Sequence, residues 1–203
     1  SGYLLRYHPG VEFAKELIKD HSIGQVKSIR YTKYSARKKP INANVIENLA
    51  SHAFALTPGF IDSIKSPLFP VSVTLKDGKP APLATASQAK FHMMYTGQDT
   101  TQHVDVEVHV GWGQADRNQL TIEGTKQHIR LDFLEHESIE CGTQKTGYRT
   151  IPTPHSISPL ESQYKHILSN SQISHVSAKD HLQTATLLDK ATLLAQQWHL
   201  HNA

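Results

Sequence analysis

The stretch Thr101-Gln-His-Val-Asp-Val-Glu-Val-His-Val-Gly-Trp112 decides the fold class of this chain. Apolar side chains from Val104 to Trp112 alternate with polar side chains from His103 to His109. Successive side chains of a β-strand point to opposite faces of its sheet. The alternation therefore predicts a strand with one buried face and one polar face.

Further strands and several helices are predicted on both sides of this stretch. Alternation and flanking turn residues predict strands at 3–7, 25–36, 69–75, 85–95, 119–123, 127–133 and 138–141. Apolar residues at helical spacing predict helices at 9–21, from 45 to a stop near Pro58-Gly59, at 159–169 and at 178–199. Strands framed by helices, without alternating strand–helix–strand units, predict an α+β fold. We expect a large, mostly antiparallel sheet with helices packed on one face.

The last predicted helix carries its own start signal and its own apolar stripe. Ser177-Ala-Lys-Asp180 matches a capping box. The stripe expected to face the sheet comprises Leu182, Ala185, Leu188, Ala195 and Trp198.

Length and composition exclude several classes of protein. The 203 residues suffice for one domain with a substantial core, and we expect residues 1–203 to form a single domain. A net charge of +3, without a basic helix interleaved with aromatic residues, argues against nucleic-acid binding. There is no run of about 18 apolar residues, so no membrane partner is expected. The single cysteine, Cys141, cannot form an internal disulfide, which fits the cytoplasmic location that we expect.

Several short motifs follow one another in an order that resembles a known family. They are Gly2-Tyr-Leu-Leu-Arg-Tyr-His-Pro9, Ile23-Gly-Gln-Val26, Asn48-Leu-Ala-Ser-His52, Leu120-Thr-Ile-Glu-Gly-Thr-Lys126 with Ile129-Arg-Leu-Asp132, and the closing helix of 177–195. Together they resemble the C-terminal domain of the glucose-fructose oxidoreductase and inositol dehydrogenase (Gfo/Idh/MocA) family. The resemblance covers nearly the whole chain.

The resemblance implies a division of labour between two domains. In this family an N-terminal Rossmann domain carries the nucleotide fingerprint and a catalytic lysine. The C-terminal domain, which is similar to that of glyceraldehyde-3-phosphate-dehydrogenase-like oxidoreductases, supplies a substrate wall, a histidine and the oligomer interface. The resemblance thus implies a sugar, polyol or related hydroxy compound as substrate, and NAD or NADP as cofactor of the full-length protein.

The residues agree with the absence of the cofactor half from this chain. No Gly-x-Gly-x-x-Gly motif occurs, and Gly111-Trp-Gly113 lies at a predicted strand end with no helix after it. We therefore expect the N-terminal Rossmann domain to be missing and the isolated chain to be inactive, without a cofactor of its own. The sheet face without helices is expected to meet either water or protein, and together with the resemblance it predicts a homo-oligomer.

His52 is the candidate catalytic residue. A histidine with a pKa near neutral can exchange a proton with a sugar hydroxyl while a nicotinamide exchanges the hydride. The opposing interpretation is that His52, on an apolar helical stripe, is a structural core residue.

The residues around His52 depart from the pattern of the family. Asn48 stands where the family has an acidic residue that shares the substrate hydroxyls, and Ala55 stands in place of an aspartate. An amide can hydrogen-bond a hydroxyl but supplies no negative charge to raise the pKa of a histidine. We therefore keep two hypotheses, a substrate-binding domain of an oxidoreductase and a binding or assembly module that lost redox activity.

Other charged residues give weaker candidates. Arg6, at the end of the first predicted strand, and Lys38, in the run Arg37-Lys-Lys39, are candidates for contact with substrate. The alternative for Arg6 is that it anchors a loop or a domain junction. The run could also bind a cofactor phosphate or be a solvated charge cluster. The chain has 14 histidines, yet His103 and His109 are too far apart on one strand for adjacent chelation, so we expect no metal site.

Overall fold

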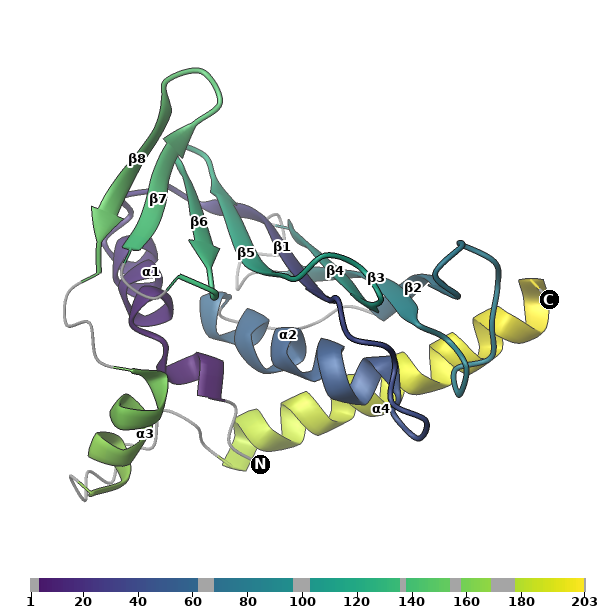
Figure 1. Cartoon of the computed structure of the whole chain (residues 1–203). Helices are drawn as coiled ribbons and strands as arrows, with labels where there is room; N and C mark the ends of the chain where they lie inside the picture. Colours follow the sequence, from purple (N-terminus) through teal and green to yellow (C-terminus); the bar gives the residue numbers. More distant parts are fainter. Residues whose placement is uncertain are drawn as a thin grey trace.

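The predicted sheet is present as one eight-stranded sheet in the order β2-β3-β4-β1-β5-β6-β7-β8 (Figure 1). The computed structural model describes residues 4–61, 68–96, 103–135, 138–153, 158–168 and 178–202. The strands are β1 (Val26–Ser35), β2 (Leu68–Thr74), β3 (Gln88–Thr96), β4 (His103–Trp112), β5 (Arg117–Gly124), β6 (His128–Asp132), β7 (Ser138–Thr143) and β8 (Gly147–Pro152). Their pairing is antiparallel except between β1 and β4, which run parallel at the centre. The prediction of an α+β fold with a mostly antiparallel sheet is confirmed.

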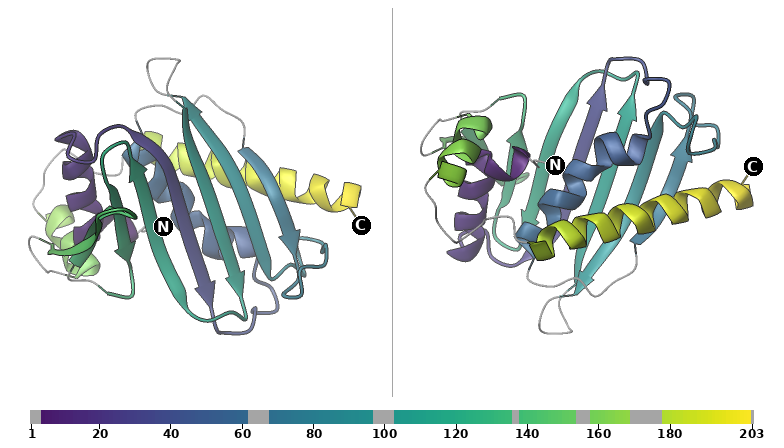
Figure 2. Two further views of the ribbon diagram at one scale, coloured as in Figure 1. Left: turned by 90° about the horizontal axis from the view of Figure 1, so that it is seen from above. Right: turned by 90° about the horizontal axis from the view of Figure 1, so that it is seen from below.

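The helices of the described residues lie on one face of this sheet. They are η1 (Leu4–Tyr7), α1 (Pro9–Lys19), η2 (Ile46–Ala50), α2 (Ser51–Leu56), η3 (Thr57–Phe60), α3 (Pro159–Leu168) and α4 (Ala178–Asn202). Figure 2 shows α2 and α4 lying across the sheet, whereas α1 and α3 gather at the end formed by β6, β7 and β8. The opposite face carries no helix of the described chain. None of the described helices is long and apolar enough to cross a membrane.

The core lies between the helices and the inward side of the sheet. The alternation in β4 is confirmed, since Val104, Val106, Val108, Val110 and Trp112 are all buried. Ile29 and Tyr31 of β1 and Leu120 and Ile122 of β5 are buried on the same side. Burying such side chains contributes about 1.5–3 kcal/mol each relative to exposure, so this layer is a main source of stability.

The prediction of a strand at 3–7 is wrong, because residues 4–7 form the 3-10 helix η1. The amide of His8 donates to the Leu5 carbonyl over 3.1 Å and closes a helical turn there. His8 then caps α1, since its Nδ1 accepts the Gly10 amide over 3.1 Å. The apolar residues of this short segment match a turn as well as they match a strand.

The prediction for the buried side of α4 is also wrong in part. Leu182 is 69% exposed and Ala185 is exposed as well. Ala195 is buried as predicted, and Leu188 and Trp198 pack half-buried against the core. The other core-facing residues of the helix are Thr184, Leu187 and Ala191. Apolar residues occur all around this helix, so the spacing alone allowed two stripes. The capping box at 177–180 lies outside the residues whose side chains are described.

Candidate functional site

The helix that bears Asn48 and His52 begins with a π-helical turn, η2, and continues as α2. Asn44 organises its start, because Asn44 Oδ1 accepts the Ile46 amide over 2.9 Å and the Asn44 carbonyl accepts the Asn48 amide over 3.0 Å. Leu49 and Ala50 are buried while Asn48 stays exposed. The first turn of the helix thus places the polar side chain of Asn48 at the edge of the core, in contact with solvent.

A cavity of about 430 Å³ opens beside Asn48. It lies between η2, the loop after β1 and the ends of β1, β4 and β5. Its lining comprises Lys33, Tyr34, Ser35, Arg37, Lys38, Pro40, Asn48, Leu49, Trp112, Asp116, Arg117, Asn118 and Leu134. The structure therefore brings two predicted substrate-binding residues, Asn48 and Lys38, to one cavity large enough for a monosaccharide-sized ligand.

His52 lies one helical turn after Asn48, and it is half-buried. Its Nδ1 is shielded from solvent and has no hydrogen-bond partner among the described residues. Burial, reinforced by the positive charge of Lys33, lowers the pKa of His52 to about 4. The ring is therefore neutral at pH 7 and has an unused nitrogen, although it is not part of the lining of the cavity.

Lys33 is the residue of this region that sequence reasoning missed. It is half-buried, and burial lowers the pKa of its ammonium group. No hydrogen bond or ion pair joins its side chain to the described part of the chain. Lys33 follows Ile29 and Tyr31 at alternate positions of β1. A lysine on the inward side of a predicted strand could therefore have pointed to Lys33 as a functional residue.

Two amides at the cavity keep hydrogen-bonding groups that no other described residue uses. The Nδ2 of Asn48 donates to the Asn44 carbonyl over 3.0 Å, which leaves its Oδ1 as an acceptor. The Oδ1 of Asn118 accepts the Tyr31 hydroxyl over 2.9 Å, which leaves its Nδ2 as a donor. Burial raises the pKa of Tyr31, so its hydroxyl stays protonated as that donor. The pair of amides can accept from and donate to a ligand hydroxyl.

Arg6, the third predicted substrate-binding residue, does not line the cavity. Its side chain is buried, and its Nε donates to the Ala55 carbonyl over 2.6 Å. That contact joins η1 to α2. The structure thus brings Asn48 and Lys38 to one cavity, whereas Arg6 lies outside its lining and contacts the helix of His52 through Ala55.

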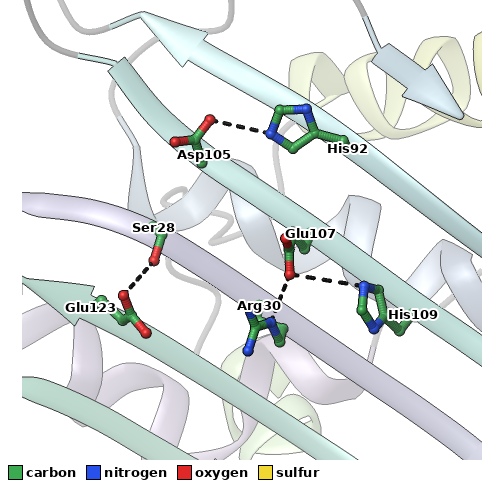
Figure 3. Close-up of polar contacts among 7 residues, drawn as sticks. All are labelled: Ser28, Arg30, His92, Asp105, Glu107, His109 and Glu123. Carbon is green, nitrogen blue, oxygen red and sulfur yellow. Dashed lines mark hydrogen bonds and ion pairs between the residues drawn. The ribbon is translucent and has the colours of Figure 1, made fainter. Parts of the chain in front are cut away.

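The helix-free face of the sheet carries a network of charged side chains (Figure 3). Glu107 Oε2 accepts from Arg30 Nε over 2.7 Å and lies 3.8 Å from His109 Nε2, while His92 Nε2 lies 3.2 Å from Asp105 Oδ1. Arg30 holds the pKa of Glu107 below its usual range. Within the described ranges, no three His, Cys, Asp or Glu side chains are grouped so as to hold a metal ion.

Comparisons with known proteins give matches among solved structures. No family model matches the sequence, and no curated protein matches it. A solved oxidoreductase from Sinorhizobium meliloti is 12% identical with a TM-score of 0.75, over 96% of this chain and 61% of that chain. Levoglucosan dehydrogenase in complex with NADH and levoglucosan is 16% identical with a TM-score of 0.72, over 96% of this chain and 63% of that one. A myo-inositol dehydrogenase candidate from Sinorhizobium meliloti 1021 is 15% identical with a TM-score of 0.68, over 97% of this chain and 62% of that chain.

At 12–16% identity, the structural similarity shows the fold alone. The chain spans only about three fifths of the length of each of these structures. The structures are of the Gfo/Idh/MocA type, in agreement with the resemblance seen in the sequence. The chain has the fold of the C-terminal part of these oxidoreductases.

Proposed function

We propose that this chain is the substrate-binding and oligomerisation domain of an NAD(P)-dependent oxidoreductase that acts on a sugar, polyol or related hydroxy compound. The observation that carries the proposal is the cavity beside Asn48, with two amides and the helix of His52 at its side. An upstream Rossmann domain would bind the nicotinamide cofactor, in a cytoplasmic protein. Levoglucosan dehydrogenase, which shares the fold, has been solved in complex with NADH and levoglucosan.

In this proposal His52 handles the proton of the reacting hydroxyl and Asn48 positions a hydroxyl. A neutral imidazole is the form that accepts a proton when an alcohol is oxidised. Lys38 contributes a positive charge at the rim of the cavity. The predicted contact between Arg6 and substrate stays a prediction, and the hydrogen bond to Ala55 supports an indirect role in holding α2.

The role of His52 is tested in the protein joined to its dinucleotide-binding domain, with saturating cofactor and an identified substrate. His52→Gln should lower kcat by roughly 10²–10⁴-fold, the usual contribution of a general acid or base. His201→Gln, at the exposed end of α4, is the matched control and should leave kcat unchanged. Wild-type turnover in His52→Gln would show that the assigned role is wrong.

A second candidate function is a binding module without redox activity. It is favoured by the absence of a carboxylate at positions 48 and 55 and by the low pKa of His52. Calorimetry with sugars and with NAD(P) separates the two functions. Sugar binding by a protein that has no cofactor-binding domain in its full gene product would support the module.

The helix-free sheet face is the surface that we propose for homo-oligomerisation. It presents side chains of both signs of charge, so the positive groups of one copy can pair with the negative groups of a second copy. The positive side chains are Arg30 and Arg130, and the negative ones are Asp105, Glu107 and Glu123. Light scattering at micromolar concentration tests this assembly. A monomer at that concentration would count against it.

A further inference from the structure

The cavity beside Asn48 is lined by more positive than negative side chains. Lys33, Arg37, Lys38 and Arg117 line it, against one carboxylate, Asp116. A larger hollow of about 550 Å³ on the helix-free face differs, because Arg30, Arg117 and Arg130 are matched there by Asp132, Glu135 and Glu140. The excess of positive charge is therefore a property of the cavity beside Asn48.

The carboxylate in the lining already has a structural partner. Asp116 Oδ1 accepts the Ala36 amide over 2.9 Å and so holds the loop that follows β1. The side chains of Lys33, Arg37 and Lys38 form no hydrogen bond or ion pair with other described residues. Lys39, next to them, differs because its Nζ donates to the Ala84 carbonyl over 2.7 Å.

Lys33 is the cation that argues most strongly for a ligand. It is half-buried on the helix side of β1, opposite Asn118 of β5 and Val110 of β4 in the register of the sheet. Removing an ammonium group from water costs free energy unless an opposite charge or hydrogen bonds replace the hydration. The described protein supplies neither, whereas an anionic group in the cavity would supply both.

We propose that the cavity recognises a sugar or polyol that carries an anionic group, a carboxylate or a phosphate, with Lys33, Arg37 and Lys38 as the residues that bind the anion. This proposal rests on the proposed function and names its substrate class. The hydroxyls of the ligand would then meet the free groups of Asn48 and Asn118.

The same arrangement couples the ligand to His52. Lys33 is one of the two causes that lower the pKa of His52, and neither position 48 nor position 55 supplies a negative charge to oppose it. An anion bound at Lys33 would offset that positive charge and raise the pKa of His52. The ligand would thereby supply the negative charge that the chain lacks at this helix.

The test measures binding to the 203-residue chain by calorimetry with pairs that differ in charge. The pairs are gluconate with glucitol for a carboxylate and glucose 6-phosphate with glucose for a phosphate, with inorganic phosphate alone as a third arm. At low ionic strength at least one anionic member should bind roughly tenfold more tightly than its neutral partner, and added salt should reduce the difference. The pair that shows the preference distinguishes carboxylate from phosphate.

Variants assign the preference to the cavity. Lys33→Gln and Arg37→Gln should each remove most of the preference for the anionic member, whereas Lys27→Gln, at the exposed start of β1, should leave it unchanged. Thermal unfolding of each variant confirms that it is folded. Equal loss in Lys27→Gln, or a preference that persists in Lys33→Gln and Arg37→Gln, would overturn the proposal.

The outcomes with the different ligands also distinguish a failure of this proposal from a failure of the proposed function. Equal binding of neutral and anionic members would overturn the anionic substrate class and leave a sugar-binding domain. Binding of inorganic phosphate without any sugar would overturn the proposed function and the substrate class together. Absence of binding by all ligands at millimolar concentration would contradict both.

Discussion

His52 combines a shielded, unpartnered ring nitrogen with a positive neighbour. Both features disfavour the protonated ring, so the free energy of unfolding should depend on pH through this residue. The folded-state pKa of about 4 lies below the ordinary 6.5, so between these values the unfolded chain binds a proton that the folded chain does not. The contribution of His52 to stability is therefore lost as pH falls from 6.5 towards 4.

His52→Gln should remove this dependence. Between pH 7 and pH 5 the wild-type chain should lose roughly 1–2 kcal/mol more unfolding free energy than the variant. Urea unfolding followed by circular dichroism at both pH values measures the difference. Identical pH dependence in the two proteins would show that the His52 ring is not shielded in this way.

Gly124 permits a close approach that no other residue allows. A Cβ at this position would overlap the Ile23 carbonyl oxygen at the end of β5. Gly124→Ala should lower the unfolding free energy by about 2 kcal/mol or more, because the backbone must move to relieve the overlap. Gly59→Ala is the control, since its Cβ would meet only the flexible Lys15 side chain, at 3.4 Å. Equal thermal stability of the two variants would contradict the close packing of β5 against the turn at Ile23.

At the scale of elements, hydrophobic alternation predicted those strands that have one buried face. The alternation holds in β4 from Val104 to Val110, and Ile29 and Tyr31 of β1 are buried at alternate positions. The predicted bounds of these strands, 25–36 and 101–112, agree closely with the structure. β8 was not predicted, because it lies at the edge of the sheet and its side chains are exposed or half-buried. An edge strand without a buried face leaves little pattern in the sequence.

The same reasoning explains what could be predicted of the candidate site. Asn48 and His52 were found because they lie in one motif, four residues apart. Their neighbours Lys33 and Asn118 come from separate strands, and only the pairing of β1 with β5 brings these two side by side. A sequence without a known strand order does not show that contact.

The link between η1 and α2 depends on Arg6. Replacing Arg6 with methionine removes the hydrogen bond to the Ala55 carbonyl and leaves that buried acceptor without its donor. The unfolding free energy should fall by about 1–3 kcal/mol. Arg149→Met, on the exposed edge strand β8, is the control and should change stability by less than about 0.5 kcal/mol. An unchanged melting temperature in Arg6→Met would contradict a structural role for this contact.

At the scale of the whole molecule, one face of the sheet is covered by helices and the other presents a charged network (Figures 2 and 3). Reversing a central charge of that network, Arg30→Glu, would place a carboxylate next to Glu107 and weaken the self-complementary interface that we propose for this face. The dissociation constant of the proposed homo-oligomer, measured by analytical ultracentrifugation, should rise by roughly tenfold or more. Lys27→Glu is the matched control, and equal dissociation constants for wild type and Arg30→Glu would contradict assembly through this face.

The measurement that tests the central claim most directly is an NMR titration of the chain with sugars, polyols and their acids. The account predicts that a binding ligand shifts the amide signals of Lys33, Asn48 and Asn118 and the imidazole signals of His52 together, and that His52→Gln leaves the shifts at Lys33 and Asn48 in place. Ligand-dependent shifts confined to the helix-free face of the sheet, or no shift in any of these four residues at saturating ligand, would contradict the account.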